Sequence, residues 1–468
     1  MPRLNNNKIS TFKMIDTVKI KKGFNINLSG KAKRKLVEID PPETYALKPT
    51  DFLGIKRPKV LVQEGDTVKA GTPILYCKTQ ENIKYVAPVS GEIAEIVRGE
   101  KRKLLEVRIL ADKKTEYESF NKFSVSELSK LDKEEIKQIM CDSGVWPNII
   151  QRPYGVVPNP EDEPRDIFIS GFDSSPLAPE FDFLYQGQES FIQAGIDIMN
   201  KLIPGQVHFS INSDAELSQV FANLKNISLH KISGPHPAGN VGVQIHHIKP
   251  IGKGDLVWTT TPFGLAQIGK LFLEGRFDAR KNIALTGPVV KNPQYYKVIQ
   301  GTNVKKILEG NTVSDNARVI SGNALTGERI PKDGYLGFYH NQITVLEEGN
   351  QPVLLGWIIP TLNELSSQRA LGLLSFLNSK NKEYNLNTNT RGDKRAFVLS
   401  GEFEKVLPMD IYPTYLFKAI LAEDYDEMEA LGIYEVIEED VALCEFIDVS
   451  KHNIQQILRQ GLELLQNS

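Results

Sequence analysis

The alternation of strand-like and helix-like segments between residues 166 and 231 constrains the fold of this chain more than any other feature. Short apolar runs typical of strands lie at 166–170, 206–210 and 227–231. Between them lie Glu189–Leu202 and Ala215–Leu224, whose apolar residues recur at helical spacing. Strands joined by helical crossovers pair in parallel, and a parallel sheet needs helices on both faces. We therefore expect an α/β unit in the middle of the chain.

The order of these elements is Rossmann-like, and ligands of such sheets bind beyond the carboxyl ends of the strands. The loops expected at that edge are 171–176, 212–214 and 233–240. None of them carries the GxGxxG pattern, so the sequence does not predict a nucleotide site. The last loop contains Gly234, Pro235, His236, Pro237 and Gly239, our candidate residues for contact with a ligand or partner. A rigid turn fixed by its two prolines is the simpler interpretation.

Residues 60–96 show a different pattern, in which short strands are separated by tight turns. The spacing Val62-x-x-Gly65-Asp66-x-Val68-x-x-Gly71, followed by Ala87-Pro88-x-x-Gly91, resembles that of biotinyl/lipoyl carrier domains. Such domains are flattened barrels of two interlocked sheets, and they carry a modified lysine at a hairpin tip. Here the tip, Lys78–Lys84, lacks the Met or Asp that usually adjoins that lysine. We expect the fold without the modification. A biotin- or lipoate-carrying protein is a lesser alternative, which a raised intact mass would reveal.

Composition excludes several classes of protein. The 468 residues carry a net charge of −2, so no positive field favours nucleic acid as a partner. No apolar run approaches the ~20 residues of a membrane-spanning helix. Residues 1–13 are basic and rich in Asn, without the apolar core of a signal peptide, and we expect them to be an extension of a cytoplasmic protein. Cys77, Cys141 and Cys444 are isolated, which disfavours disulfides, a thiolate zinc site and an iron–sulfur cluster and favours buried free thiols.

Two near-matches to known motifs lack an essential part. The segment Gly264–Leu271 resembles a phosphate-binding P-loop, but Leu271 stands where the motif needs a hydroxyl, and the apolar spacing favours an amphipathic helix. His246 and His247 lie in a segment that we expect to be a strand, where adjacent side chains point to opposite faces. His236 could supplement one of them, but no carboxylate or cysteine cluster completes a metal site. Since the known catalytic signatures are also missing, we expect no catalytic, cofactor-binding or metal-binding residues.

Residues 281–333 read as a strand, a tight turn, a second strand, a short helix and a third strand. This order predicts a small β-grasp domain and resembles the soluble-ligand-binding β-grasp (SLBB) module. We expect an α/β plus β multidomain protein divided as follows: 1–13 extension, 14–112 carrier-like barrel, 113–164 helix and connector, 165–280 Rossmann-like domain, 281–333 β-grasp domain, and 334–468 a mostly helical C-terminal domain.

This domain order resembles that of the NqrA family, the first subunits of the sodium-translocating NADH:quinone oxidoreductases, and the resemblance runs along nearly the whole chain from Met14. The most specific segments are Lys21-Lys22-Gly23, Trp146-Pro147, Arg152-Pro153, Ser175-Pro176-Leu177-Ala178, Gly234-Pro235-His236-Pro237-Ala238-Gly239, Leu285-Thr286-Gly287-Pro288-Val289-Val290, Val319-Ile320-Ser321-Gly322, Leu325-Thr326-Gly327, Tyr335-Leu336-Gly337, Tyr339-His340 and Val406-Leu407-Pro408-Met409-Asp410-Ile411. One departure is Asp448, which stands where the family has a second cysteine after Cys444.

The resemblance implies a peripheral protein on the cytoplasmic side of the bacterial inner membrane. The whole complex would use NADH, flavins, iron–sulfur centres and quinone to expel sodium. This chain would hold no redox centre, would contact the membrane and flavoprotein subunits NqrB to NqrF, chiefly NqrB, and would contribute to quinone interaction. The alternative is a soluble ligand-binding or scaffold protein built on carrier-like and β-grasp domains.

Overall fold

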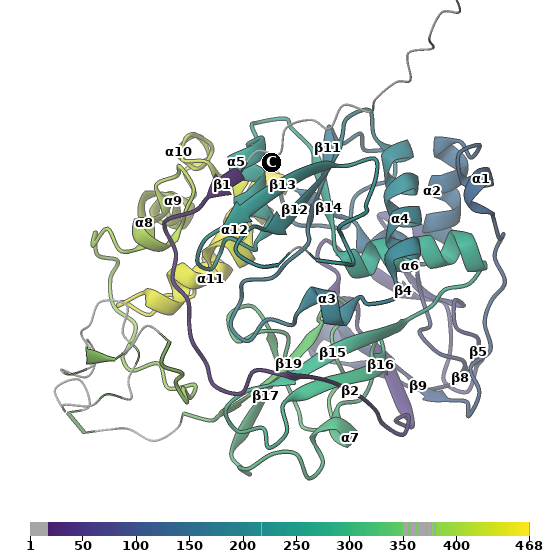
Figure 1. The fold of residues 1–468 in the computed structure, drawn as a ribbon, viewed down its shortest axis with the longest axis horizontal. Coiled ribbons are helices and arrows are strands. Elements are labelled where there is room, and N and C mark those ends of the chain that lie inside the picture. Colours follow the sequence, from purple (N-terminus) through teal and green to yellow (C-terminus); the bar gives the residue numbers. More distant parts are fainter. Residues whose placement is uncertain are drawn as a thin grey trace, which may run out of the picture.

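A computed structural model shows a flattened barrel, an α/β sheet, a second mixed sheet and a helical cluster, packed side by side (Figure 1). The structure describes residues 17–216, 218–349, 354–355, 362, 365, 374, 377–378 and 381–467. The expected extension at residues 1–13 lies outside these ranges.

The carrier-like barrel is confirmed and is built from two small antiparallel sheets. One has the strand order β3-β9-β8-β5 and the other β4-β6-β7. Buried Ile74, Ile83, Ile93 and Ile109 fill the space between them. The strands are β3 Thr44–Leu47, β4 Pro58–Val60, β5 Thr67–Val68, β6 Pro73–Cys77, β7 Gln80–Val86, β8 Gly91–Arg98 and β9 Leu104–Ala111.

The central α/β sheet is also confirmed. Its strand order is β1-β13-β12-β11-β14-β10, and only β10 is antiparallel to its neighbour. The strands are β1 Thr17–Lys19, β10 Ile150–Arg152, β11 Asp166–Ser170, β12 Val207–Asn212, β13 Ser228–Ser233 and β14 Val257–Thr260. The helices of this part of the chain are α1 Val125–Leu128, α2 Lys133–Asp142, α3 Phe181–Leu184, α4 Glu189–Leu202, α5 Val241–Ile248 and α6 Pro262–Glu274.

Helices cover both faces of this sheet, as expected for a parallel sheet. Successive residues of β11 point to opposite faces. Ile167 and Ile169 join the apolar core formed with α4 and α6, whereas Phe168 packs with Ile245 of α5 on the other face. Figure 1 shows α4 and α6 on one side of the sheet and α5 on the other.

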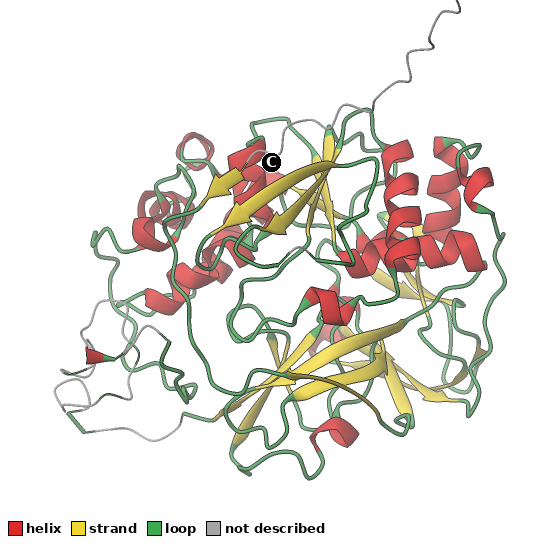
Figure 2. Cartoon of the chain, in the orientation of Figure 1, coloured by secondary structure: helices red, strands yellow, loops and turns green. Residues whose placement is uncertain are grey.

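The second six-stranded sheet contains the predicted β-grasp elements, with the strand order β18-β17-β19-β15-β16-β2. Figure 2 shows that helices gather around the α/β sheet and in the C-terminal cluster, whereas this sheet carries only short ones. Its elements are β2 Lys33–Glu38, β15 Arg280–Thr286, β16 Gln294–Ile299, α7 Lys305–Leu308, β17 Ala317–Ser321, β18 Glu328–Ile330 and β19 Gln342–Glu347.

Three strands cross the expected domain boundaries. Strand β19 lies between β17 and β15, so the sheet continues past residue 333. Strands β1 and β2 precede the barrel in the chain but pair with the α/β sheet and the β-grasp sheet, respectively. The N-terminal segment therefore connects both sheets, a contact between distant residues that local sequence patterns do not encode.

The C-terminal part forms a helical cluster around a second apolar core, in which Cys444 is fully buried. Cys77 and Cys141 are free and buried too, as predicted. No helix among the described residues combines the length and apolar character needed to cross a bilayer. The helices are α8 Phe403–Val406, α9 Pro413–Leu421, α10 Tyr425–Ala430, α11 Glu438–Ile447 and α12 Ile454–Asn467.

Two expected elements are wrong. Of the predicted helix Ala215–Leu224, the described residues form turns, in which Phe221 donates its backbone N–H to the Ser218 hydroxyl. A helix this short is marginal unless packing supports it. The predicted strand at residues 241–247 is helix α5. Its β-branched residues suggested a strand, but packing against the sheet decides the structure.

Candidate functional site

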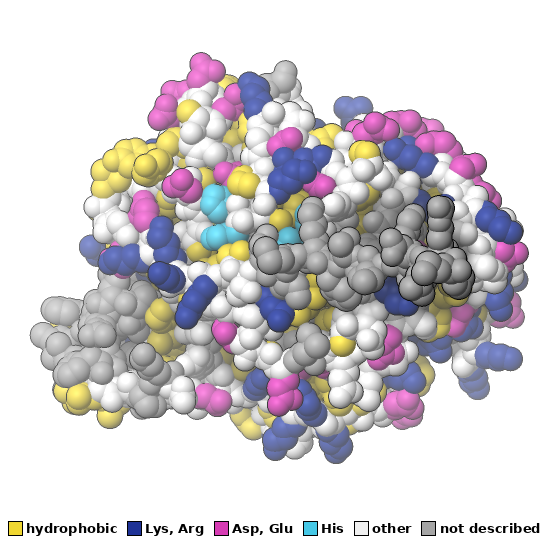
Figure 3. All heavy atoms as spheres, turned by 45° about the horizontal axis from the view of Figure 1, so that its top comes forward, with side chains coloured by type: hydrophobic (Ala, Val, Ile, Leu, Met, Phe, Trp, Pro, Cys, Tyr) yellow, Lys and Arg dark blue, Asp and Glu magenta, His cyan; other side chains and the backbone are white. Residues whose placement is uncertain are grey.

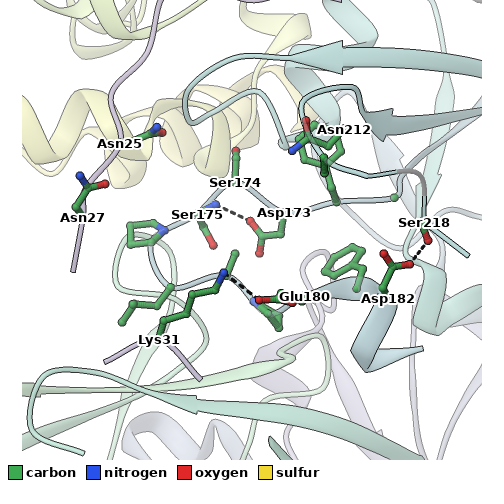
Figure 4. A pocket seen from close by; sticks show the side chains of 18 of the residues that line it. Asn25, Asn27, Lys31, Asp173, Ser174, Ser175, Glu180, Asp182, Asn212 and Ser218 are labelled. Atoms are coloured by element: carbon green, nitrogen blue, oxygen red, sulfur yellow. Dashed lines mark hydrogen bonds and ion pairs between the residues drawn. The ribbon is translucent and has the colours of Figure 1, made fainter. Parts of the chain in front are cut away.

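The loops that follow β11, β12 and β13 meet at one edge of the α/β sheet, as the sequence predicted. They surround a pocket of about 770 Å³. The first loop contributes Asp173, Ser174 and Ser175, the second Asn212, and the third Gly234. Figure 4 shows Asp173, Ser174 and Ser175 at the centre of this pocket, with Asn212 beside them. The volume lies within the range of small-molecule sites, roughly 300–1,000 Å³.

Sequence reasoning missed the contribution of the N-terminal segment to this pocket. Asn25, Asn27, Lys31 and Arg34 lie between or within β1 and β2 and line its opposite wall. The segment is fixed to the third loop because His236 donates its backbone N–H to Asn25 Oδ1 at 2.8 Å. No local pattern could have indicated this contact, since its partners are far apart in the chain.

The five candidate residues of the third loop differ in their position: Gly234 alone among them lines the pocket. Gly234 lines the pocket, whereas His236 is only 4% exposed and lies behind the wall. Its Nδ1 is 3.1 Å from the Ser174 hydroxyl oxygen, which also accepts the Gly239 N–H at 2.8 Å. Burial lowers the pKa of His236 to about 4, so the ring is neutral at pH 7. Pro235 and Pro237 flank this histidine. The loop thus positions Ser174.

The charges of the pocket wall are unevenly paired. Glu180 binds both nearby cations, with Lys31 Nζ at 3.1 Å and Arg34 Nε at 2.5 Å. Asp173 accepts the Ser175 N–H at 2.7 Å and forms no ion pair with a described residue. Burial raises the pKa of the Asp173 carboxyl above its ordinary value. Asp182, further along the wall, hydrogen-bonds to the Ser218 hydroxyl.

A buried ion cluster adjoins the third loop and joins the α/β sheet to helix α11. Arg152 of β10 is 1% exposed and donates to Asp440 Oδ2 at 2.6 Å and to Glu439 Oε1 at 2.5 Å. The Glu439 carbonyl accepts a hydrogen bond from Asn240, at the end of the loop. Partial burial and the adjacent Asp440 raise the pKa of Glu439 above its ordinary value, against the effect of Arg152. This cluster fixes the helical domain against the back of the site.

The other titratable residues singled out by the sequence do not converge on the pocket. His246 pairs with Glu435 at 2.7 Å, and His247 Nδ1 lies 2.9 Å from the Val243 carbonyl oxygen of its own helix. Within the described ranges, no group of three or more His, Cys, Asp or Glu side chains is arranged to hold a metal ion. Gly264–Leu271 lies within helix α6, as predicted.

The hairpin tip of the barrel lies apart from this site. Lys84 donates to the Glu81 carbonyl and lies over the Tyr76 ring, and neither it nor Lys78 lines the pocket.

Comparison with known proteins assigns the chain to a family. Three family models match: the NqrA N-terminal barrel-sandwich hybrid domain over residues 18–112, the NqrA second alpha/beta domain over 131–277, and the NQRA C-terminal domain over 282–332. The NqrA subunit of the Na+-translocating NADH-quinone reductase from Neisseria meningitidis serogroup B is 36% identical over 450 residues, which cover 96% of this chain and 99% of the relative. The chain belongs to the NqrA family.

Other NqrA relatives agree. The NqrA subunits from Vibrio parahaemolyticus and Haemophilus influenzae are each 34% identical, again over 96% of this chain and 99% of the relative. A crystal structure of an NAD+-reducing nickel–iron hydrogenase aligns with 74% of this chain and 68% of its own, at 13% identity and a TM-score of 0.38, and this similarity is too low to support a conclusion. The resemblance to the NqrA family is confirmed.

Proposed function

We propose that this chain is a working NqrA subunit of a Na+-translocating NADH:quinone oxidoreductase, located at the cytoplasmic side of the bacterial inner membrane. The observation that carries the proposal is the match to NqrA subunits along 96% of the chain and 99% of the relatives. In this role the chain supports quinone reduction coupled to sodium export. It contacts the other subunits, NqrB to NqrF and chiefly NqrB, while NADH, flavins and iron–sulfur centres are handled by those partners.

Co-purification tests this proposal directly. The chain is tagged in its own bacterium, the membranes are solubilised gently, and the bound proteins are identified. We expect recovery of a flavin-containing complex with NADH:quinone activity that sodium stimulates. Recovery of the tagged chain alone from the soluble fraction would contradict the proposal.

We further propose that the chain performs no redox step itself. The carrier-like barrel lacks the usual modification sequence at Lys78–Lys84, and the three cysteines are separate and buried. The purified chain should therefore lack stoichiometric flavin absorbance, and its intact mass should equal that of the unmodified polypeptide. A flavin retained at one per chain would overturn this part of the proposal and leave the family assignment intact.

The loop Gly234–Gly239 is our candidate for quinone or partner interaction. Gly234 lies at the pocket wall, and His236 acts from behind it by positioning Ser174. If the loop supports the quinone step, His236→Asn should raise the KM for quinone in the intact complex and leave flavin reduction by NADH unchanged. An unchanged KM, together with lower stability, would identify the loop as a structural turn only.

The second candidate function, a soluble ligand-binding or scaffold protein, is favoured by one observation, the roomy polar pocket at the sheet edge. It predicts that the tagged chain purifies without membrane proteins of the complex, so the same co-purification experiment discriminates the two.

A further inference from the structure

The pocket at the carboxyl edge of the α/β sheet has an excess of acidic side chains. Among the described residues that line it, the carboxylates are Asp173, Glu180, Asp182, Glu216 and Glu383, and the cations are Lys31 and Arg34. Both cations bind Glu180. The other four carboxylates form no ion pair with a described residue, so the wall presents negative charge to whatever enters.

Asp173 is the best placed of these carboxylates to meet a ligand. Figure 4 shows it between Ser175 and Asp182, with its carboxylate toward the pocket interior. Asp173 accepts the Ser175 N–H at 2.7 Å and also interacts with the Ser175 hydroxyl, and these neutral donors do not cancel the charge of a carboxylate. Its pKa is raised by burial, as expected for a carboxylate that has lost water without gaining a counter-charge.

A second observation is the side chain of Ser175. This residue is 8% exposed and lines the pocket, and its hydroxyl interacts with the Asp173 carboxylate but forms no hydrogen bond of good geometry with a described residue. Buried hydroxyls are normally fully hydrogen-bonded, so this one still has capacity to bond a ligand atom. It lies beside Asp173, and together they offer one charged acceptor and one hydroxyl.

The same features disfavour an anionic ligand. Phosphate sites use glycine-rich loops at helix N-termini or unpaired Arg and Lys side chains. None of the three edge loops has the glycine pattern, and both cations of the wall are already paired.

We propose that this pocket binds a small ligand bearing a guanidinium or protonated amino group, which pairs with Asp173 while a neighbouring polar group bonds to the Ser175 hydroxyl. The site belongs to this chain itself and does not depend on the proposed role in a sodium pump.

Isothermal titration of the purified full-length chain tests the proposal. Arginine and citrulline form a matched pair of probes, because they have nearly the same shape and differ in the charge of the side-chain terminus. Agmatine adds a cation without a carboxylate, and adenosine monophosphate serves as the anionic probe. We expect agmatine and arginine to bind, citrulline to bind at least about tenfold more weakly, and adenosine monophosphate not to bind.

Variants then locate the site. Asp173→Asn keeps the shape and should weaken agmatine binding about tenfold or more, and Ser175→Ala should weaken it severalfold. Asp214→Asn is the matched control, because Asp214 lies in the second edge loop but outside the pocket wall. Circular dichroism confirms that each variant is folded.

The proposal is overturned if neither agmatine nor arginine binds, if citrulline or adenosine monophosphate binds as well as they do, or if Asp214→Asn weakens agmatine binding as much as Asp173→Asn. None of these results would affect the co-purification experiment, so the two proposals fail separately.

Discussion

At the scale of single residues, Lys281 shows that the fold can bury a side chain that is normally charged and exposed. Its side chain is 3% exposed in β15, where the ammonium lies 3.4 Å from the Phe338 carbonyl oxygen and 4.5 Å from the centre of the Phe263 ring. Burial lowers its pKa to about 7. The burial of the three isolated cysteines was predictable from sequence, because unpaired cysteines usually pack as small apolar side chains. The surroundings of Lys281 depend on residues far along the chain and were not predictable.

The pH dependence of stability should report this lysine. A free lysine in the unfolded chain keeps its proton to about pH 10.5. Between about pH 7 and that value the unfolded state therefore binds more protons, and stability increases with pH. From about pH 7 to about pH 9 the contribution is about 2 kcal/mol. Lys281→Met should abolish this increase in urea unfolding.

The control for this prediction is Lys297→Met on the neighbouring strand β16. Lys297 is 48% exposed and pairs with Glu38 at the surface, so the variant should keep the wild-type pH dependence. An equal response of the two variants would mean that burial of Lys281 does not control it.

At the scale of elements, the apolar patterns predicted helices and strands correctly where the local pattern and the tertiary packing agree. Strand Asp166–Ser170 and helix Glu189–Leu202 have the predicted bounds. The errors at 215–224 and 241–247 occur where the local pattern is short and tertiary contacts outweigh it. Sequence also could not reveal how closely α4 and α6 approach. A Cβ on Gly269 would lie 1.9 Å from the Phe191 carbonyl oxygen, and one on Gly195 would lie 2.2 Å from that of Leu265.

This close approach makes a small substitution costly. Gly269→Ala should destabilise the chain by about 2–4 kcal/mol, because the added methyl group meets backbone and the two helices must separate. Chemical denaturation measures the change. Gly252→Ala is the control, since the nearest atom to its added Cβ is a side-chain oxygen of Asp255 at 3.5 Å. A loss for Gly269→Ala no larger than that of the control would contradict the packing argument.

At the scale of the whole molecule, the candidate pocket is formed by segments that lie far apart in the sequence. The three edge loops were predictable, because the carboxyl ends of parallel strands share an edge. The wall formed by Asn25, Asn27 and Lys31 was not, since it requires β1 and β2 to leave the barrel segment and join two other sheets. On the face shown in Figure 3, cationic and anionic side chains are intermixed, in agreement with the net charge of −2.

The helical cluster is held to the α/β sheet by buried charge, and this contact can be tested. Arg152→Met would leave Glu439 and Asp440 without their counter-charge, so we expect a loss of about 3–5 kcal/mol in the free energy of unfolding. Denaturant unfolding followed by fluorescence measures it. Adding Glu439→Gln and Asp440→Asn should recover part of this loss.

Lys253→Met is the matched control. Lys253 also joins the α/β unit to the helical cluster, through Glu429 at 2.6 Å, but it is 73% exposed. Its loss should leave the unfolding midpoint nearly unchanged. A similar effect of both variants would show that burial of Arg152 is not what matters.

The positions of β1 and β2 also affect the order in which the protein can fold during its synthesis. Both strands leave the ribosome early, but β1 has no partner until Lys231 has been synthesised, and β2 has none until Gln294. The barrel is synthesised after these two strands and before their partners, and it can fold first, since domains generally fold as units during synthesis. Until the N-terminal segment returns, β13 and β16 each present an open edge that could pair with another chain. Translation speed and chaperone access should therefore affect the yield of this protein more than that of one whose strands pair in the order of synthesis.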